Sequence, residues 1–139
     1  MKNFLLYLWQ LPQNLLGLIL ILCYKPKEKI VLANGNIVYF TTRIPGGISL
    51  GKYSIINHYY WRKYKGDIEK ILELDIVKHE GIGHGTQSRY LGPLYLLVIG
   101  LPSIIWATLY GSVIPRTENG YYRFYTEKSA DKLGGVIRK

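Results

Sequence analysis

Cysteine, histidine and charged side chains are all scarce in this sequence. Cys23 is the only cysteine in 139 residues, which excludes an internal disulfide and a cysteine-rich zinc site. The only imidazoles are those of His58, His79 and His84. We find no internal repeat, no low-complexity segment and no glycine-rich phosphate loop, which argues against a solenoid protein and a P-loop nucleotide-binding protein.

Hydrophobic residues are plentiful instead. They make up 48% of the chain, and charged residues only 19%, while the net charge is +9. A basic chain attracts nucleic acid or an anionic membrane surface. Thirteen tyrosines and three tryptophans favour the membrane, because amphipathic rings are enriched at the headgroup level. We therefore expect one domain over residues 1–139, membrane lipid as a partner, a membrane location and no nucleic acid.

The first apolar run covers residues 4–24 and is flanked by lysines. A run of about 20 residues is long enough to cross a bilayer. Polar residues and Pro12 interrupt it, and Pro12 favours the start of a second helical piece. We predict a membrane-associated helix, either an uncleaved anchor or a helix in the membrane plane, with a buried core helix as the alternative.

Residues 29–57 have the composition of β-strands. Asn34-Gly35 lies between two such segments and is a strong hairpin signal. Pro45-Gly46-Gly47 predicts a further turn, followed by a strand over residues 48–57. These features predict a meander of three antiparallel strands.

The sequence KHEGIGH, residues 78–84, is the most informative stretch. Two histidines and a glutamate are the side chains that a zinc hydrolase uses to hold a metal ion and to supply a base. The usual spacing is HExxH, but His79 and His84 are five residues apart. Five steps of an α-helix turn the second ring by roughly 140°, away from the first. A π-bulge would bring the rings together, and Gly81 and Gly83 make that distortion easy.

A second stretch, residues 127–131 (EKSAD), supplies another carboxylate for a metal and, one turn later, Asp131. HEGIGH resembles the HExxGH helix of dipeptidyl-peptidase-III-type metallopeptidases. EKSAD resembles the ExxA(D/E) helix of that group and of CAAX-prenyl-protease-type membrane metallopeptidases. The resemblance implies a gluzincin with Zn²⁺ held by His79, His84 and Glu127. It also implies Glu80 as the catalytic base, Asp131 as the partner of a ligand histidine, and a peptide or protein substrate that pairs with an edge strand.

Residues 67–89 predict the metal-site helix, with Asp67 as its N-cap. The uncharged residues 90–114 have the hydropathy of a membrane span. A single crossing would separate the histidines from Glu127, so we expect this block to double back. Gly100 to Ser103 is a suitable turn, which predicts a central apolar helical hairpin of about 93–100 and 103–112.

A polar loop over residues 115–120 and a glutamate helix over 121–134 complete the prediction. Tyr121, Tyr122, Arg123 or Tyr125 would then be placed to stabilise an oxyanion. The fold class is α+β, a small zincin-like domain with a three-stranded sheet. A partner subunit or homo-oligomer would complete so small a cleft.

Three alternatives remain open at this stage. In the first, the histidines belong to a glycine-rich turn and residues 127–132 to a solvated helix face. In the second, the chain is a small basic membrane protein that binds a partner, with a structural metal or none and no catalysis. The aromatic and basic residues 57–65 are a third candidate, since such clusters bind nucleic acid as well as lipid headgroups.

Overall fold

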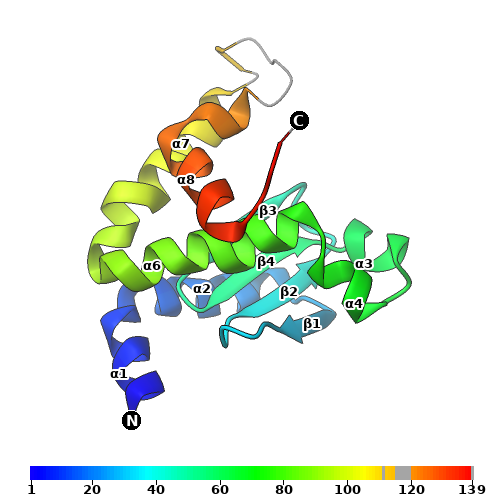
Figure 1. The fold of residues 1–139 in the computed structure, drawn as a ribbon, viewed down its shortest axis with the longest axis horizontal. Helices are drawn as coiled ribbons and strands as arrows, with labels where there is room; N and C mark the ends of the chain where they lie inside the picture. Colours follow the sequence, from blue (N-terminus) through cyan, green and yellow to red (C-terminus); the bar gives the residue numbers. More distant parts are fainter. Residues whose placement is uncertain (111, 115–119, 139) are drawn as a thin grey trace.

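The computed structural model describes residues 1–110, 112–114 and 120–138, and the loop predicted over residues 115–120 therefore lies almost wholly outside the described residues. The fold is α+β, as predicted, with one four-stranded sheet and helices on both of its faces (Figure 1). The strands are β1 (Glu28–Val31), β2 (Ile37–Thr41), β3 (Gly47–Leu50) and β4 (Tyr53–Asn57). The α-helices are α1 (Lys2–Trp9), α2 (Leu11–Tyr24), α3 (Tyr59–Lys63), α4 (Ile68–Leu72), α5 (Asp75–Val77), α6 (Gly85–Leu91), α7 (Leu101–Leu109) and α8 (Tyr125–Gly134).

The prediction of three antiparallel strands was wrong in two respects. Residues 48–57 form two strands, because the chain turns at Gly51, whose φ of +65° suits glycine. The strand order is β1-β2-β4-β3, and β2 and β4 run parallel, so the sheet is mixed. The predicted Asn34-Gly35 hairpin is confirmed by the antiparallel pairing of β1 with β2. β3 is left at the edge of the sheet.

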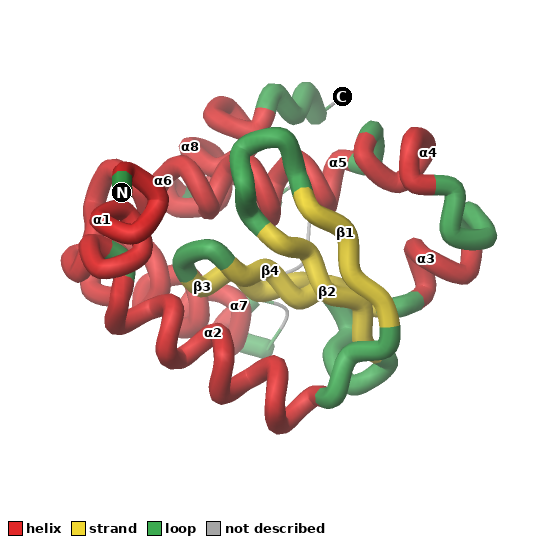
Figure 2. Tube along the Cα trace, turned by 90° about the horizontal axis from the view of Figure 1, so that it is seen from below, coloured by secondary structure: helices red, strands yellow, loops and turns green. Residues whose placement is uncertain are grey.

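One face of the sheet packs on the helical segment that contains residues 78–84, and α2 covers the other (Figure 2). Side chains alternate along each strand, so Val38, Phe40 and Ile56 join Ile71 and Val77 in the main core. The aromatic cluster of residues 57–65 contributes three partly buried rings to this core, those of Tyr60, Trp61 and Tyr64.

The N-terminal run forms two helices, α1 and α2, bent by 82° at the predicted break. Pro12 lies in the first turn of α2, as expected. The burial pattern of α2 is the reverse of that expected for a surface helix of a globular protein, because its fully buried side chains are the polar Gln13 and Asn14. Its exposed face is apolar and consists of Leu15, Leu16, Leu18, Ile19 and Leu22.

The predicted helix over residues 67–89 is broken after α4, at Glu73 and Leu74, and a second helical segment then runs from Asp75 to Leu94. Asp67 caps α4 by accepting a hydrogen bond from the Lys70 amide. Within the second segment the chain forms a π-helix over Lys78–His84. The π-bulge predicted from the histidine spacing is therefore present.

The chain doubles back after this segment, but not at the predicted turn. The bend of 118° lies between Leu94 and Leu96, whereas Gly100 to Ser103 continues from a π turn (Leu96–Gly100) directly into α7. The predicted hairpin of 93–100 and 103–112 was therefore wrong.

The predicted glutamate helix of residues 121–134 starts later than expected, because Tyr121–Arg123 is a 3-10 turn and α8 begins at Tyr125. It ends as expected, with Gly135 left-handed at φ +74°.

Among the described residues, no single helix is both long and apolar enough for a membrane crossing. Two bent pairs reach that length and composition together, namely α1 with α2, and Asp75–Leu94 with Leu96–Leu109.

Candidate metal centre

Glycines allow the π segment to pack closely on α8 and on the sheet side. A side chain on Gly83 would place its Cβ 2.1 Å from the Ala130 carbonyl oxygen of α8, so only glycine permits this approach. A Cβ on Gly81 would lie 2.4 Å from a Leu32 methyl carbon, on the sheet side. A Cβ on Gly134 of α8 would lie 2.5 Å from the Lys78 carbonyl oxygen, so this glycine permits the same close contact from the other helix. The π turn is thus wedged between the sheet and α8.

His79 and His84 face each other, with ring centroids 4.8 Å apart. The Nδ1 atom of His79 lies 2.7 Å from Asp131 Oδ1, and that of His84 lies 2.7 Å from Gln87 Oε1. Since both partners are acceptors, each Nδ1 carries the proton and donates it. The Nε2 atoms of both rings are therefore the atoms that can bind a metal ion.

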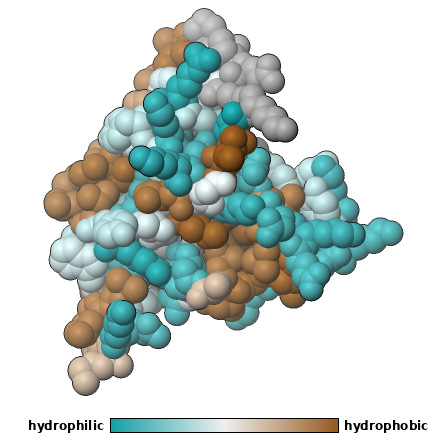
Figure 3. All heavy atoms as spheres, viewed as in Figure 1, coloured by the Kyte–Doolittle hydropathy of each residue, from teal (hydrophilic) through white to brown (hydrophobic). Residues whose placement is uncertain are grey.

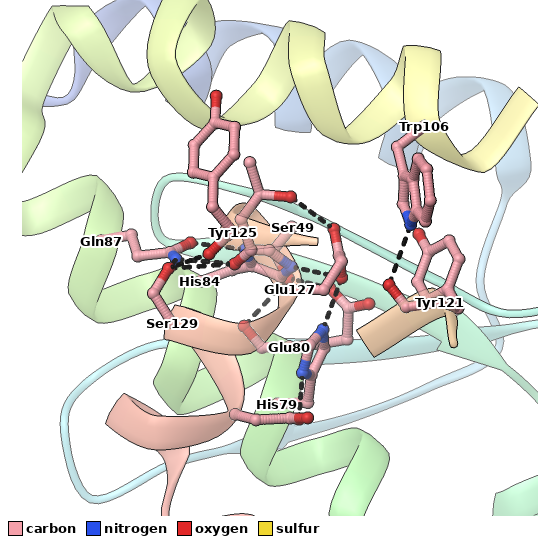
Figure 4. Close-up of polar contacts among 12 residues, drawn as sticks. Ser49, His79, Glu80, His84, Gln87, Trp106, Tyr121, Tyr125, Glu127 and Ser129 are labelled. Atoms are coloured by element: carbon pink, nitrogen blue, oxygen red, sulfur yellow. Dashed lines mark hydrogen bonds and ion pairs between the residues drawn. The ribbon is translucent and has the colours of Figure 1, made fainter. Parts of the chain in front are cut away.

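Glu127 of α8 meets both Nε2 atoms (Figure 4). Its Oε2 atom lies 2.9 Å from His79 Nε2 and 3.5 Å from His84 Nε2. Its other oxygen, Oε1, accepts a hydrogen bond from Thr126 Oγ1 at 3.1 Å. A buried carboxylate between two imidazole Nε2 atoms requires positive charge there, which either two protons or one metal ion can supply.

The pKa shifts of His79, His84 and Glu127 show that these three side chains interact electrostatically. Burial lowers the pKa of His84, but the hydrogen bond to Glu127 and the charges of Glu80 and Glu127 outweigh it and raise the pKa to about 9. Burial also lowers the pKa of His79, while Glu127 and Glu80 raise it above the ordinary value. Burial raises the pKa of Glu127, and the two histidines hold it well below its usual range nevertheless. The two carboxylates therefore favour positive charge at the imidazoles, which protons or a metal ion can supply.

Glu80 lies beside the histidines and is held by hydrogen bonds from serines of β3 and β4. Ser49 Oγ donates to Glu80 Oε2 at 2.5 Å, and Ser54 Oγ donates to the Glu80 carbonyl oxygen at 3.2 Å. A Cβ on Gly47 would lie 2.8 Å from Glu80 Oε1, so the carboxylate rests against the bare backbone of β3. His79, Glu80 and His84 each offer a ligand atom within 4.8 Å of the others, and this group could hold a metal ion.

Asp131 is fixed from the far side by Arg138. The guanidinium donates to both carboxylate oxygens, each at 2.9 Å, and lies over the Tyr122 ring at 3.4 Å from its centroid. Tyr122 in turn packs edge-on against His79, with centroids 5.4 Å apart. Arg138 is therefore part of the support of His79.

Two adjoining cavities share Glu80 in their lining, and the smaller of them lies between β3 and α7. The larger, of about 650 Å³, includes His79 in its lining, and the smaller, of about 290 Å³, includes His84 and Glu127. Gly47, Glu80 and Tyr121 line both, and several of the other shared or flanking side chains are apolar. His79, Glu80 and His84, the group that could hold a metal ion, thus line a cleft.

The open edge of β3 borders this cleft. The Asn57 amide donates to the Gly46 carbonyl at 2.9 Å, which turns Gly46 toward β4. Because neighbouring residues of an antiparallel strand alternate in direction, Gly47 and Ser49 turn their backbone groups to the open edge. The Ser49 carbonyl accepts from the Tyr95 hydroxyl at 2.9 Å, and Gly47 remains next to Glu80.

The structure brings together all five residues predicted from the sequence: His79, Glu80, His84, Glu127 and Asp131. Of the aromatic residues before Glu127, Tyr121 lines the cleft, Tyr122 supports His79, and Tyr125 donates to the Val98 carbonyl at 2.6 Å. Sequence reasoning missed Gln87, Ser49 and Arg138. Only Gln87 had a local signal, its position three residues after His84 on the same helical face.

Comparisons with known proteins found no matching family model, no matching curated protein and no matching solved structure.

Proposed function

We propose that this chain is a zinc-dependent metallopeptidase. The observation that supports it best is the convergence of His79 Nε2, His84 Nε2 and Glu127 Oε2, with both Nδ1 protons engaged elsewhere. Two imidazoles and one carboxylate, closed on one side and open to a cleft on the other, suit a catalytic zinc ion. When bound there, zinc would polarise a carbonyl oxygen and acidify a water molecule.

The side chains of this site divide the chemistry among them. Glu80 takes a proton from the attacking water and passes it to the leaving amine. Ser49 holds one oxygen of that carboxylate, which leaves the other oxygen at the cleft. Asp131 and Gln87 fix the tautomers of the two histidines. Tyr121, which lines both cavities, is the candidate for an oxyanion contact.

The edge of β3 supports a peptide as the substrate. An extended peptide can add to an open strand edge through its backbone. The Gly47 amide and carbonyl are turned that way, and a Cβ on Gly47 would meet the Glu80 side chain, so the two residues are neighbours. A peptide paired there would have a carbonyl group close to the base.

We also propose that the protein works at a membrane. On α2 the polar side chains are buried and the apolar ones are exposed, which lowers the free energy of the protein only where lipid meets that face. Figure 3 shows a second hydrophobic area over α7 and the turn before it, where Leu97, Leu101, Ile104 and Ile105 are half exposed or more. The same helix borders the cleft, since Ser103, Ile104, Ala107 and Thr108 line its smaller cavity.

The experiment that tests the proposal is chelation of the purified protein in detergent, with zinc content and cleavage of a quenched fluorescent peptide library measured on one preparation. We expect one zinc ion per chain, loss of cleavage with the chelator, and recovery with zinc but not with magnesium, which prefers oxygen ligands. Zinc that binds without cleavage would favour a structural metal. A preparation that takes up no zinc would favour a partner-binding membrane protein.

The contact between Gly47 and Glu80 gives a second test. Gly47→Ala should push the Glu80 carboxylate aside, since the new Cβ would lie 2.8 Å from Oε1. A misplacement of about 1 Å can cost roughly 10²-fold in rate, so we expect a loss of that order with unchanged zinc content. Gly46→Ala is the matched control, because nothing lies within 4 Å of its Cβ. Equal activity of the two variants would show that Glu80 needs no fixed position.

A further inference from the structure

A third pocket, which shares no lining residue with the two cavities beside Glu80, gathers positive charge without a carboxylate in its lining. It has a volume of about 330 Å³ and lies among α1, α2, α6 and the turns of the two hairpins. Three cations from three elements line it, namely Lys2 of α1, Lys52 of the β3–β4 turn and Arg89 of α6. None of the three forms an ion pair within the part of the chain that the structure describes.

Arg89 is the most informative of these cations. Its Nη2 atom donates to the Asn34 carbonyl and, at 3.1 Å, to Asn36 Oδ1, so it meets neutral acceptors only. Its Nε atom is buried and has no hydrogen-bond partner among the described residues. A partly buried guanidinium without a counter-charge is costly. Such a group provides fork-shaped donors that match a phosphate or a carboxylate.

The walls of this pocket are fixed before any ligand arrives. Asn36 Nδ2 donates to the Gly81 carbonyl at 2.9 Å, which fastens the β1–β2 turn to the π segment. The Lys52 amide donates to Asn14 Oδ1 at 2.7 Å, which fastens the β3–β4 turn to α2. The turns that bear Asn36 and Lys52 are therefore held in place without a ligand, and preorganisation of this kind favours binding.

We propose that this pocket binds a phosphate group. Two sources share that chemistry, the headgroup of an anionic phospholipid and a soluble phosphorylated compound. The exposed apolar side chains of α1, those of Phe4, Leu5 and Leu8, lie on the element that carries Lys2, where acyl chains could cover them. Basic pockets next to apolar helices recognise lipid headgroups in this way. The proposal does not depend on the metal centre, so either can fail without the other.

The test compares Lys52→Gln and Arg89→Gln with Lys29→Gln, which removes an exposed cation from β1. Binding is measured at one ionic strength to phosphatidylcholine vesicles with and without phosphatidylglycerol, and to inorganic phosphate by calorimetry in neutral detergent. Each pocket variant should bind phosphatidylglycerol vesicles about fivefold more weakly than Lys29→Gln does. Binding to pure phosphatidylcholine should be the same for all.

The two probes separate the two sources. A loss confined to phosphatidylglycerol vesicles identifies the lipid headgroup. A loss of inorganic phosphate binding, with no preference for phosphatidylglycerol, identifies a soluble phosphorylated ligand. If Arg89→Gln fails to fold, as judged by circular dichroism, Lys2→Gln combined with Lys52→Gln replaces it. Pocket variants that match Lys29→Gln with both probes, or a wild type that binds neither, would overturn the proposal.

Discussion

Replacement of Glu80 by glutamine is expected to lower peptide cleavage by about 10²–10⁴-fold, the usual contribution of a general base, and to leave the zinc content unchanged. Glutamine has nearly the same shape as glutamate, so it still packs against Gly47 and accepts from Ser49. It cannot take up a proton from water at neutral pH. Turnover of a fluorogenic peptide and zinc content, measured on the same sample, check both parts of the expectation.

Glu80 has two possible roles at this site, and the zinc content decides between them. Its carboxylate offers a ligand atom within 4.8 Å of those of His79 and His84. A variant that loses zinc together with activity would make Glu80 a ligand, and the assignment of the base would be wrong. A variant with full activity would remove the proposed mechanism altogether. Glu69→Gln, an exposed acid on α4, controls for the loss of one negative charge.

The π-bulge shows what a sequence can predict when chemistry adds a constraint. Propensity alone would not place a π-helix at residues 78–84, but two rings five residues apart can meet on one ion only if the helix takes up an extra residue. The same constraint predicted that the chain must return after residue 90. It did not predict the position of the bend, and Gly100 to Ser103, which have the composition of a turn, led to the wrong position. Pro102 begins a helix there, since a proline in the first helical turn loses no hydrogen bond.

The contacts that were missed are all contacts between distant residues. Ser49 reaches Glu80 only because β3 lies at the sheet edge, and β3 lies there only because β4 inserts beside β2 in parallel. Arg138 reaches Asp131 because the chain turns back after Gly135. Neither arrangement leaves a periodic pattern in the sequence. The local signals, by contrast, were sufficient for the Asn34-Gly35 hairpin and the Asp67 cap.

Replacement of Glu127 by glutamine should abolish stable zinc binding and, with it, activity. Glu127 is 2% exposed, and its Oε2 atom is the only carboxylate oxygen that ion-pairs with both histidine Nε2 atoms among the described residues. Glutamine keeps the volume and removes the charge, so the effect cannot be attributed to a cavity. Asp131→Asn should have a smaller effect, a loss of about 10–100-fold in zinc affinity, as is usual for the partner of a ligand histidine.

Comparison of Glu127→Gln with Glu80→Gln distinguishes a site made by one helix from a site assembled across the fold. If the π segment alone binds the ion, through His79, Glu80 and His84, then Glu127→Gln keeps zinc and Glu80→Gln loses it. If α8 supplies the third ligand, Glu127→Gln loses zinc and Glu80→Gln keeps it. Thermal unfolding with and without added zinc gives an independent measure, because an ion that binds only the folded chain raises its stability. The zinc-dependent shift should vanish in Glu127→Gln and persist in Glu80→Gln, and the reverse result would place the third ligand in the π segment.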